Sequence, residues 1–254
     1  MRPFIGSQAR RVGLAALLTV SAALSVAARP AHSKPVVSNP VRVTADVTET
    51  DVTESNKKVG EAYGALVAMW TNDFRQLGAE FVAPNIVRYR GNVRSQCGIM
   101  RANNAQYCPQ LNAIFFDEVF VARQAKAAAN ELGTDGDMAA VGIIAHEMGH
   151  AVAMQLGETS RIPYENEAKA DCLAGAFALQ SSKDGSLEKG DLEEAFFGLA
   201  AAGDPTPVFT GYEQIDARIA RRAQIMGHGT REQRLANFKT GFGGGPKACL
   251  AAFR

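Results

Sequence analysis

The sequence lacks any excess of charge of one sign. It has 27 Lys and Arg residues against 26 Asp and Glu residues, which gives a formal net charge of +1. Proteins that bind nucleic acid usually present a strongly basic surface, and this composition supplies none. The chain also lacks an internal repeat of the period seen in solenoid proteins. We therefore expect neither a nucleic-acid partner nor a repeat architecture.

Acidic residues are missing from the start of the chain, where the first one is Asp46. Three arginines precede an apolar run of small residues from Val12 to Ala28, an order typical of a secretory signal. The run is also just long enough to cross a bilayer. We predict that residues 1–33 are a signal peptide or an N-terminal anchor and that the protein is periplasmic or secreted. An uncleaved anchor would be its contact with the membrane.

Beyond this segment, the sequence divides into a polar linker over residues 34–54 and a single domain over residues 55–254. Strands are predicted over residues 85–89 and 113–116, and helices over residues 55–78, 137–156, 163–180, 186–202, 212–225 and 230–239. Strands gathered early and helices gathered late indicate an α+β fold. We expect a mainly helical domain with a small antiparallel sheet.

Four cysteines follow the predicted signal, namely Cys97, Cys108, Cys172 and Cys249. An even number of cysteines in an exported chain favours disulfide bonds, and three pairings are formally possible. The short separation of Cys97 and Cys108 favours a local link. That choice leaves Cys172 to connect a helix to the C-terminal tail through Cys249.

A five-residue motif, His146-Glu147-Met148-Gly149-His150, lies in the predicted helix 137–156. Residues four apart share a helix face, so His146 and His150 can direct their imidazoles at one metal ion. Glu147 lies about 100° further round the helix, where its carboxylate can reach a water. The flanking residues are apolar nearly all round, so the helix should be buried, and a metal would offset the cost of burying these groups. We predict a Zn²⁺ site with Glu147 as general base.

A catalytic zinc ion usually has three protein ligands and an open position, so a third ligand is required. Glu167 lies in the first turns of the next predicted helix, and a helical hairpin would bring it beside the motif. Asp171 lies four residues further along the same face and can accept the outer N–H of a ligand histidine. Glu165 is the competing ligand, but it has no acid at that spacing. The predicted ligands are His146, His150 and Glu167.

Several segments in this order resemble the putative neutral zinc metallopeptidases of bacteria. They are Cys97 to Cys108, Phe115-Phe116-Asp117-Glu118, the motif itself, Glu167 to Gly175, His228-Gly229-Thr230 and Gln233-Arg234. The resemblance extends from about Arg88 to Cys249 and departs from the family pattern between Gly203 and His228. It implies a zincin-like metallopeptidase domain, a Zn²⁺ cofactor and a peptide or protein substrate. It also implies that Glu167 is the third ligand and Asp171 a supporting acid.

The predicted activity is hydrolysis of peptide bonds by a zinc-activated water. Glu147 would take a proton from this water and return it to the leaving amine. His228 is the one histidine of the predicted mature chain outside the motif, so it is a candidate catalytic residue, although a structural role at a helix start fits it equally. A strand near residues 111–116 could offer an edge to an extended substrate.

Two other functions remain open at this stage. A deformylase-like zinc hydrolase would take Cys97 or Cys108 as its third ligand. Export disfavours this function, because thiols in an oxidising compartment form disulfides. A non-catalytic exported zinc-binding protein would use the metal to hold its helices or to bind a partner. Glu147 argues against that function, because a structural site does not need a base.

Overall fold

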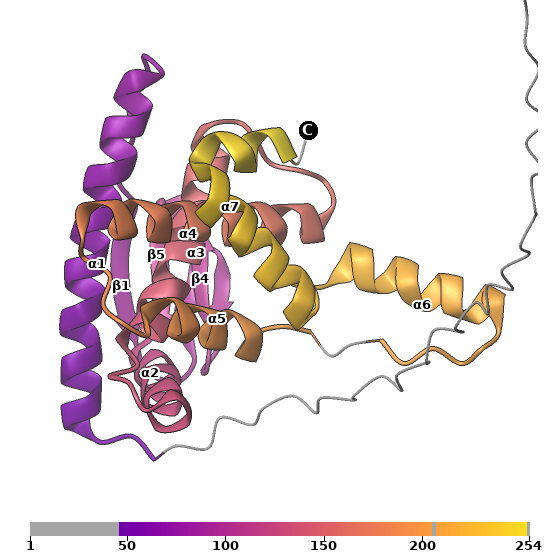
Figure 1. The fold of residues 1–254 in the computed structure, drawn as a ribbon, viewed down its shortest axis with the longest axis horizontal. Helices are drawn as coiled ribbons and strands as arrows, with labels where there is room; N and C mark the ends of the chain where they lie inside the picture. The colour runs from indigo at the N-terminus through magenta and orange to yellow at the C-terminus, as the bar shows by residue number, and fades with distance from the viewer. Residues whose placement is uncertain (1–45, 205–206, 253–254) are drawn as a thin grey trace, which may run out of the picture. The chain divides into compact units, whose positions relative to one another are not determined.

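The computed structural model describes residues 46–204 and 207–252 (Figure 1), so the predicted signal peptide or anchor lies outside the described residues. The first helix, α1 (Glu49–Gln76), begins earlier than the predicted start at residue 55, within the stretch interpreted as a linker. A capping box explains this start. Thr48 Oγ1 accepts a hydrogen bond from the Asp51 amide, and the Asp51 carboxylate accepts one from the Thr48 amide.

Three strands form a sheet in the order β1 (Asn85–Tyr89), β5 (Ala113–Asp117), β4 (Ala105–Cys108). The central strand, β5, is buried at every position, as its continuous apolar sequence requires. The short helix η1 (Pro109–Leu111) connects β4 to β5, and these two strands are antiparallel. A separate antiparallel hairpin consists of β2 (Val93–Ser95) and β3 (Gly98–Met100).

The predicted α+β class with mainly helical content and a small sheet is confirmed, but the sheet is not wholly antiparallel. β1 pairs with β5 in parallel, with Val87 opposite Phe115. The β2–β3 hairpin and β4 lie between these strands in the chain and form the long crossover that a parallel pair needs. The idea that residues 111–116 offer a free edge is wrong, because β5 is central and β4 is an edge strand.

Helix α2 (Glu118–Leu132) follows β5 directly and was not among the predicted helices. Asp117 is its N-cap, because the carboxylate accepts hydrogen bonds from the amides of Val119 and Phe120. Gly133, with a φ of 71°, ends the helix in the left-handed conformation that favours glycine. Both signals are local, and together they set where α2 begins and ends.

Helix α3 (Asp137–Gln155) carries the motif and is buried along almost its whole length, in agreement with its apolar flanks. Its N-terminus is capped from another element, α5 (Asp191–Ala201). The buried Glu194 carboxylate accepts hydrogen bonds from the amides of Gly136 and Met138, both at 2.9 Å. This contact satisfies amides that the helix cannot satisfy itself and fixes α3 to α5.

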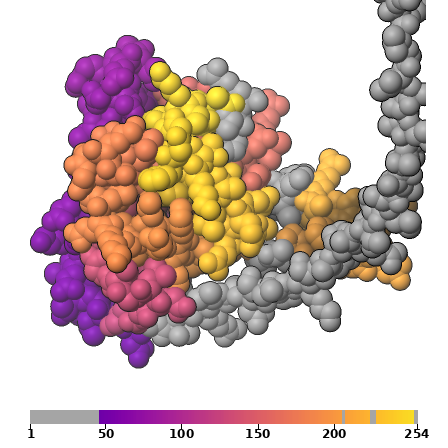
Figure 2. All heavy atoms as spheres, viewed as in Figure 1, coloured from indigo at the N-terminus to yellow at the C-terminus, as the bar shows by residue number. Residues whose placement is uncertain are grey.

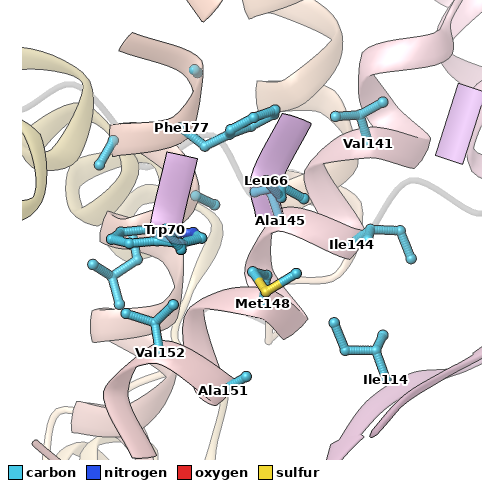
Figure 3. Packing of buried hydrophobic residues seen from close by; sticks show 14 of the residues in the cluster. Leu66, Trp70, Ile114, Val141, Ile144, Ala145, Met148, Ala151, Val152 and Phe177 are labelled. Atoms are coloured by element: carbon cyan, nitrogen blue, oxygen red, sulfur yellow. The ribbon is translucent and has the colours of Figure 1, made fainter. Parts of the chain in front are cut away.

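The main core packs around α3 (Figure 3). Ile144, Met148 and Val152 of α3 pack in one cluster with Trp70 of α1 and Ile114 of β5. All five side chains are buried, so α3 is held between the long first helix and the sheet. The motif helix is therefore a rigid support for the site.

Helices α4 (Pro163–Asp184) and α7 (Arg231–Ala252) approach each other closely. A Cβ atom at Gly175 would lie 2.0 Å from the Phe238 carbonyl oxygen, and one at Gly241 would lie 1.7 Å from that of Cys172. Larger residues would force the two backbones apart. Figure 2 shows the surface of α7 beside that of α5. Helix α6 (Glu213–Met226) lies between α5 and α7 in the chain.

The four cysteines form two disulfides, Cys97–Cys108 and Cys172–Cys249. This is the pairing that the sequence favoured, and the second bond ties α4 to the end of α7. Disulfides persist in oxidising compartments, so they favour a periplasmic or extracellular location. None of the helices in the described part of the chain is both long and apolar enough to span a bilayer.

Candidate metal centre

The two motif histidines meet Glu167 of α4 at one point. His146 Nε2 lies 3.2 Å from His150 Nε2 and 3.1 Å from Glu167 Oε2, and His150 Nε2 lies 3.5 Å from Glu167 Oε1. One ligand atom from each of these residues lies within 4.8 Å of the other two. The structure thus brings together the three residues that the sequence analysis selected. Glu165, the competing carboxylate, is not part of this group.

A glycine inside the motif explains why α4 can come so close. A Cβ atom at Gly149 would lie 2.8 Å from the carbonyl oxygen of Ala170, closer than real Cβ contacts allow. The backbones of α3 and α4 therefore touch where Gly149 faces Ala170. Glu167 and Asp171 lie on either side of Ala170 in α4, so this contact sets the distance of both carboxylates from His146.

Behind His146 lies a buried network that the sequence analysis only partly identified. Asp171 Oδ1 is 2.8 Å from His146 Nδ1, which is the contact expected of the supporting acid. Arg234 of α7 donates to Asp171 Oδ1 at 2.6 Å and to the Ala202 carbonyl at 3.1 Å, and its Nη2 lies 3.2 Å from His146 Nδ1. Arg234 was noted as a matching residue but was given no role. Its partner is 63 positions away in the chain, so no spacing rule could find it.

The electrostatics of the network favour charged side chains despite burial. Burial alone would lower the pKa of His146, but hydrogen bonds to Asp171 and Glu167 raise it to about 10. Burial opposes ionisation of Glu167, yet the two histidines hold its pKa well below the usual range. Burial likewise opposes ionisation of Asp171, and Arg234 and His146 lower its pKa. The carboxylates are therefore ionised and offer negative charge to a cation.

Glu147 lies beside this group but bonds elsewhere. It is buried, and its Oε2 accepts a hydrogen bond of 2.7 Å from the backbone amide of Tyr107 in β4. No other hydrogen bond to Glu147 is formed among the described residues, so its second oxygen remains available. The Tyr107 hydroxyl donates to Asn112 Oδ1 at 2.9 Å. Burial raises the pKa of this hydroxyl.

A cleft of about 960 Å³ opens onto His146, Glu147, His150 and Glu167. The edge strand β4 forms one of its walls, and residues of α2, α5 and the start of α4 form others. A cleft of this size accommodates several residues of a bound chain. The charged and polar groups of the centre are thus accessible from solvent on one side and enclosed by the core on the other.

His228 lies at the rim of the same cleft, and its side chain is 60% exposed. Its Nδ1 is 3.8 Å from Asp204 Oδ1. The next residue, Gly229, has a φ of 92° and packs on the ring of Tyr164, where a Cβ atom would lie 2.7 Å from a ring carbon. The structure therefore places His228 near the centre on a constrained turn, and its catalytic role stays a prediction.

The donor set fits zinc. Two imidazole nitrogens and one carboxylate with open space in front of them are typical of a catalytic Zn²⁺ site, and the contact to Asp171 is typical of an outer partner. A cysteine ligand is excluded, because all four cysteines are in disulfides. This removes the deformylase-like arrangement with Cys97 or Cys108.

A second group of acids, Asp135, Asp137, Asp191 and Glu194, also comes close together. Three of its members have other partners. Lys58 pairs with Asp137 at 2.6 Å, Glu194 caps α3, and Asp191 accepts a hydrogen bond from the Glu188 amide. We assign this group to the structure of the α3–α5 contact.

Comparisons with known proteins agree with this geometry. The model of the family described as putative neutral zinc metallopeptidase matches residues 12–253. The uncharacterized protein YpfJ of Escherichia coli K12 is 33% identical over 200 residues, which cover 72% of this chain and 66% of that protein. The YpfJ protein of E. coli O6:H1 matches equally, so the chain spans just under two thirds of these relatives. No solved structure gives a significant match. The chain belongs to the putative neutral zinc metallopeptidase family, and its cofactor is Zn²⁺.

Proposed function

We propose that this protein is a zinc-dependent metallopeptidase that hydrolyses peptide bonds, with His146, His150 and Glu167 as the zinc ligands. The observation that carries the proposal is the convergence of these three side chains, within 4.8 Å, at the base of a cleft that also contains a buried glutamate. A structural zinc site is usually closed by four protein ligands, whereas this group has three and faces open space.

Zinc, when bound, supplies a Lewis acid that polarises a carbonyl group and makes water a stronger acid. Glu147 provides the base. Its Oε2 is held by the Tyr107 amide, which orients the carboxylate and leaves Oε1 to accept the proton of the attacking water. Glu147 then returns this proton to the leaving amine.

Asp171 and Arg234 position His146. With zinc bound, His146 would be the neutral imidazole: Asp171 would accept its Nδ1 proton, and the lone pair would lie on Nε2, which faces Glu167 and His150. Arg234 in turn holds Asp171 as an ion and in place, through hydrogen bonds from both Nε and Nη2. The proposed role of the two residues is to act through His146.

The edge strand β4 is the docking site for the substrate backbone. The backbone groups of alternate residues in a strand point to the same edge. The Tyr107 amide meets Glu147 at the free edge of β4, so the backbone groups of Ala105 face that edge as well. An extended peptide can add to this edge and bring its carbonyl group to the centre. His228 at the rim is the candidate donor to the oxyanion, because its side chain is exposed and lines the cleft.

Export completes the proposal. Residues 1–33 act as a signal peptide or an anchor, residues 34–54 mainly link it to the domain, and the enzyme acts in the periplasm or outside the cell. The two disulfides support this location. Fractionation of the native host, with free-thiol counting on the recovered protein, tests it. Recovery of the full-length chain in the cytosol with four free thiols would contradict it.

The activity is tested by zinc analysis and peptide-library cleavage of the wild type and of three variants. Glu147→Gln should keep its zinc and lose activity by about 10²–10⁴-fold, as expected for loss of a general base. Glu167→Ala should lose zinc. Glu165→Ala is the matched control, since this neighbouring acid lies outside the group and should change neither quantity.

Either of two results would refute the assignment. Cleavage by Glu147→Gln at the wild-type rate would exclude Glu147 as the base, and full zinc occupancy in Glu167→Ala would exclude Glu167 as a ligand.

His228→Ala should lower kcat by about 10²–10³-fold at unchanged zinc content. An unchanged kcat in this variant would leave His228 with a structural role.

A further inference from the structure

One polar side chain in the wall of the cleft has no hydrogen-bond partner. Gln124 of α2 is 6% exposed and lines the cleft, and its Oε1 is fully buried without a hydrogen bond. Its Nε2 forms none with the described residues either. Burial of an amide without a partner costs about 1–3 kcal/mol. A group that remains unsatisfied at the wall of a binding cleft is suited to a ligand.

Three large apolar side chains line the same cleft as Gln124. Phe120 lies one turn before it on α2, Ile143 comes from α3, and Leu199 comes from α5. These three helices pack against one another, and neither α2 nor α5 contributes a charged side chain to the cleft. The wall is therefore an apolar surface with one neutral polar group.

This wall is next to the metal centre. Ile143 precedes His146 by three residues on α3, and residues three apart lie on the same helix face. A substrate residue adjacent to the cleaved bond can therefore place its side chain against Ile143 and direct the tip toward Gln124. The close fit of α5 on α3, where a Cβ at Gly198 would lie 3.0 Å from the Ala139 carbonyl oxygen, keeps this wall fixed.

We propose that Phe120, Gln124, Ile143 and Leu199 form a specificity subsite for a substrate side chain with an apolar body and a neutral hydrogen-bonding tip, foremost tyrosine. The inference rests on the proposed peptidase function. An aromatic ring gains apolar contact and ring packing against Phe120 and Ile143. The phenol oxygen accepts a hydrogen bond from Gln124 Nε2, because Oε1 is enclosed by the protein. Phenylalanine fills the same space but leaves the amide unpaired, and a charged side chain meets no opposite charge on this wall.

The test uses the zinc-loaded full chain and two peptide hydroxamates that differ only in having Tyr or Phe beside the metal-binding group. Their affinities are measured by titration calorimetry, which does not depend on turnover. The wild type should bind the Tyr compound about five- to tenfold more tightly, as one added hydrogen bond to a buried group predicts. Gln124→Met keeps the length of the side chain and removes the amide, so it should reduce this ratio to about one.

Asn237→Leu is the matched control. The Asn237 side-chain nitrogen is also buried without a partner, but Asn237 does not line the cleft, so this variant should keep the wild-type ratio. Absence of a Tyr preference in the wild type would overturn the inference, as would an unchanged ratio in Gln124→Met or failure of both hydroxamates to bind. If the Tyr preference is present but no peptide is cleaved, the proposed function fails and the subsite stands. If peptides are cleaved without this preference, only the subsite fails.

Discussion

At the scale of single residues, the chemistry of the centre depends on a buried ion pair behind it. Asp171 and Arg234 are both almost fully buried, and the two opposite charges pair with each other. Breaking such a pair leaves an unpaired buried charge, which costs more than the pair contributes. The arginine is also needed for its shape, because two of its nitrogens contact the same carboxylate.

Arg234→Met should therefore destabilise the protein by about 3–5 kcal/mol and weaken zinc binding by about 10–100-fold. The loss of stability follows from the unpaired Asp171, and the loss of affinity follows from the poorer orientation of His146. Urea unfolding and chelator competition measure the two effects. Arg231→Met, at an exposed position on the same helix, is the control. Wild-type zinc affinity in Arg234→Met would show that the network does not position the histidine.

The residues of the centre that sequence reasoning reached are those whose relation is local. The spacing of His146 and His150 on one helix, and of Glu167 and Asp171 on the next, requires only helical periodicity. Arg234 and the Tyr107 amide were missed because their contacts join distant elements, and a backbone donor has no sequence signature. The same holds for Gln124, whose significance lies in the absence of a partner.

At the scale of elements, the centre requires that α3 and α4 touch at Gly149. Gly149→Ala should cost about 1–3 kcal/mol through overpacking, because the neighbouring atoms are backbone and cannot rotate away. The same shift should move Glu167 from the histidines and lower zinc affinity. Calorimetric unfolding and zinc titration measure both consequences.

Gly64→Ala is the matched control for this substitution. Gly64 lies in α1 with no atom within 4 Å of the added Cβ, so alanine should stabilise the protein by about 0.5–1 kcal/mol. Stability changes of opposite sign in the two variants would support the close approach of α3 and α4 at Gly149. Equal stability changes would mean that Gly149 is not a contact point between α3 and α4.

The stability of the contact between α3 and α5 is expected to depend on pH through Asp191. Burial, with the nearby charges of Asp137, Glu194 and Asp135, raises the pKa of Asp191 to about 6, against a hydrogen bond from the Glu188 amide that lowers it. A carboxyl whose pKa is higher in the folded state binds more protons there than in the unfolded chain. Stability should therefore fall as pH rises from about 4 to about 6, by on the order of 1 kcal/mol after screening.

Asp191→Asn keeps an oxygen for the Glu188 amide and removes the titration, so it should flatten this pH dependence and stabilise the protein above pH 6. Urea midpoints measured between pH 4 and pH 8 test it. Glu193→Gln, exposed on the same helix, should retain the wild-type profile. A profile that is unchanged in Asp191→Asn would assign the effect to another group.

The elements themselves were predictable to different degrees. The long helices around the motif were predicted because apolar periodicity marks a buried face. Helix α2 was missed even though Asp117 and Gly133 mark its two ends. The start of α1 was placed too late because its first turns are polar and depend on the Thr48 capping box. The parallel pairing of β1 could not be predicted, because it depends on how the chain crosses over and not on the strand's own sequence.

At the scale of the whole molecule, the two disulfides differ in how much chain they close. The bond between Cys172 and Cys249 spans a separation of 77 residues, whereas that between Cys97 and Cys108 spans 11. Loop entropy then gives about 4–5 kcal/mol for the first bond and about 3 kcal/mol for the second. The first also joins α4 to α7, the helices that supply Asp171 and Arg234, so it links the end of the chain to the centre.

Replacing both Cys172 and Cys249 by Ala should therefore lower the free energy of unfolding by about 4–5 kcal/mol and weaken zinc binding as well. The paired replacement of Cys97 and Cys108 is the control, since that disulfide does not join α4 to α7 and its loss should affect stability with less effect on zinc affinity.

Because a bound metal stabilises the folded state, excess zinc should recover part of the lost stability, about 4 kcal/mol at a thousandfold excess over Kd. Urea unfolding with and without added zinc measures the coupling. If zinc affinity were equal in the two double variants, the link between α4 and α7 would be shown to serve stability alone.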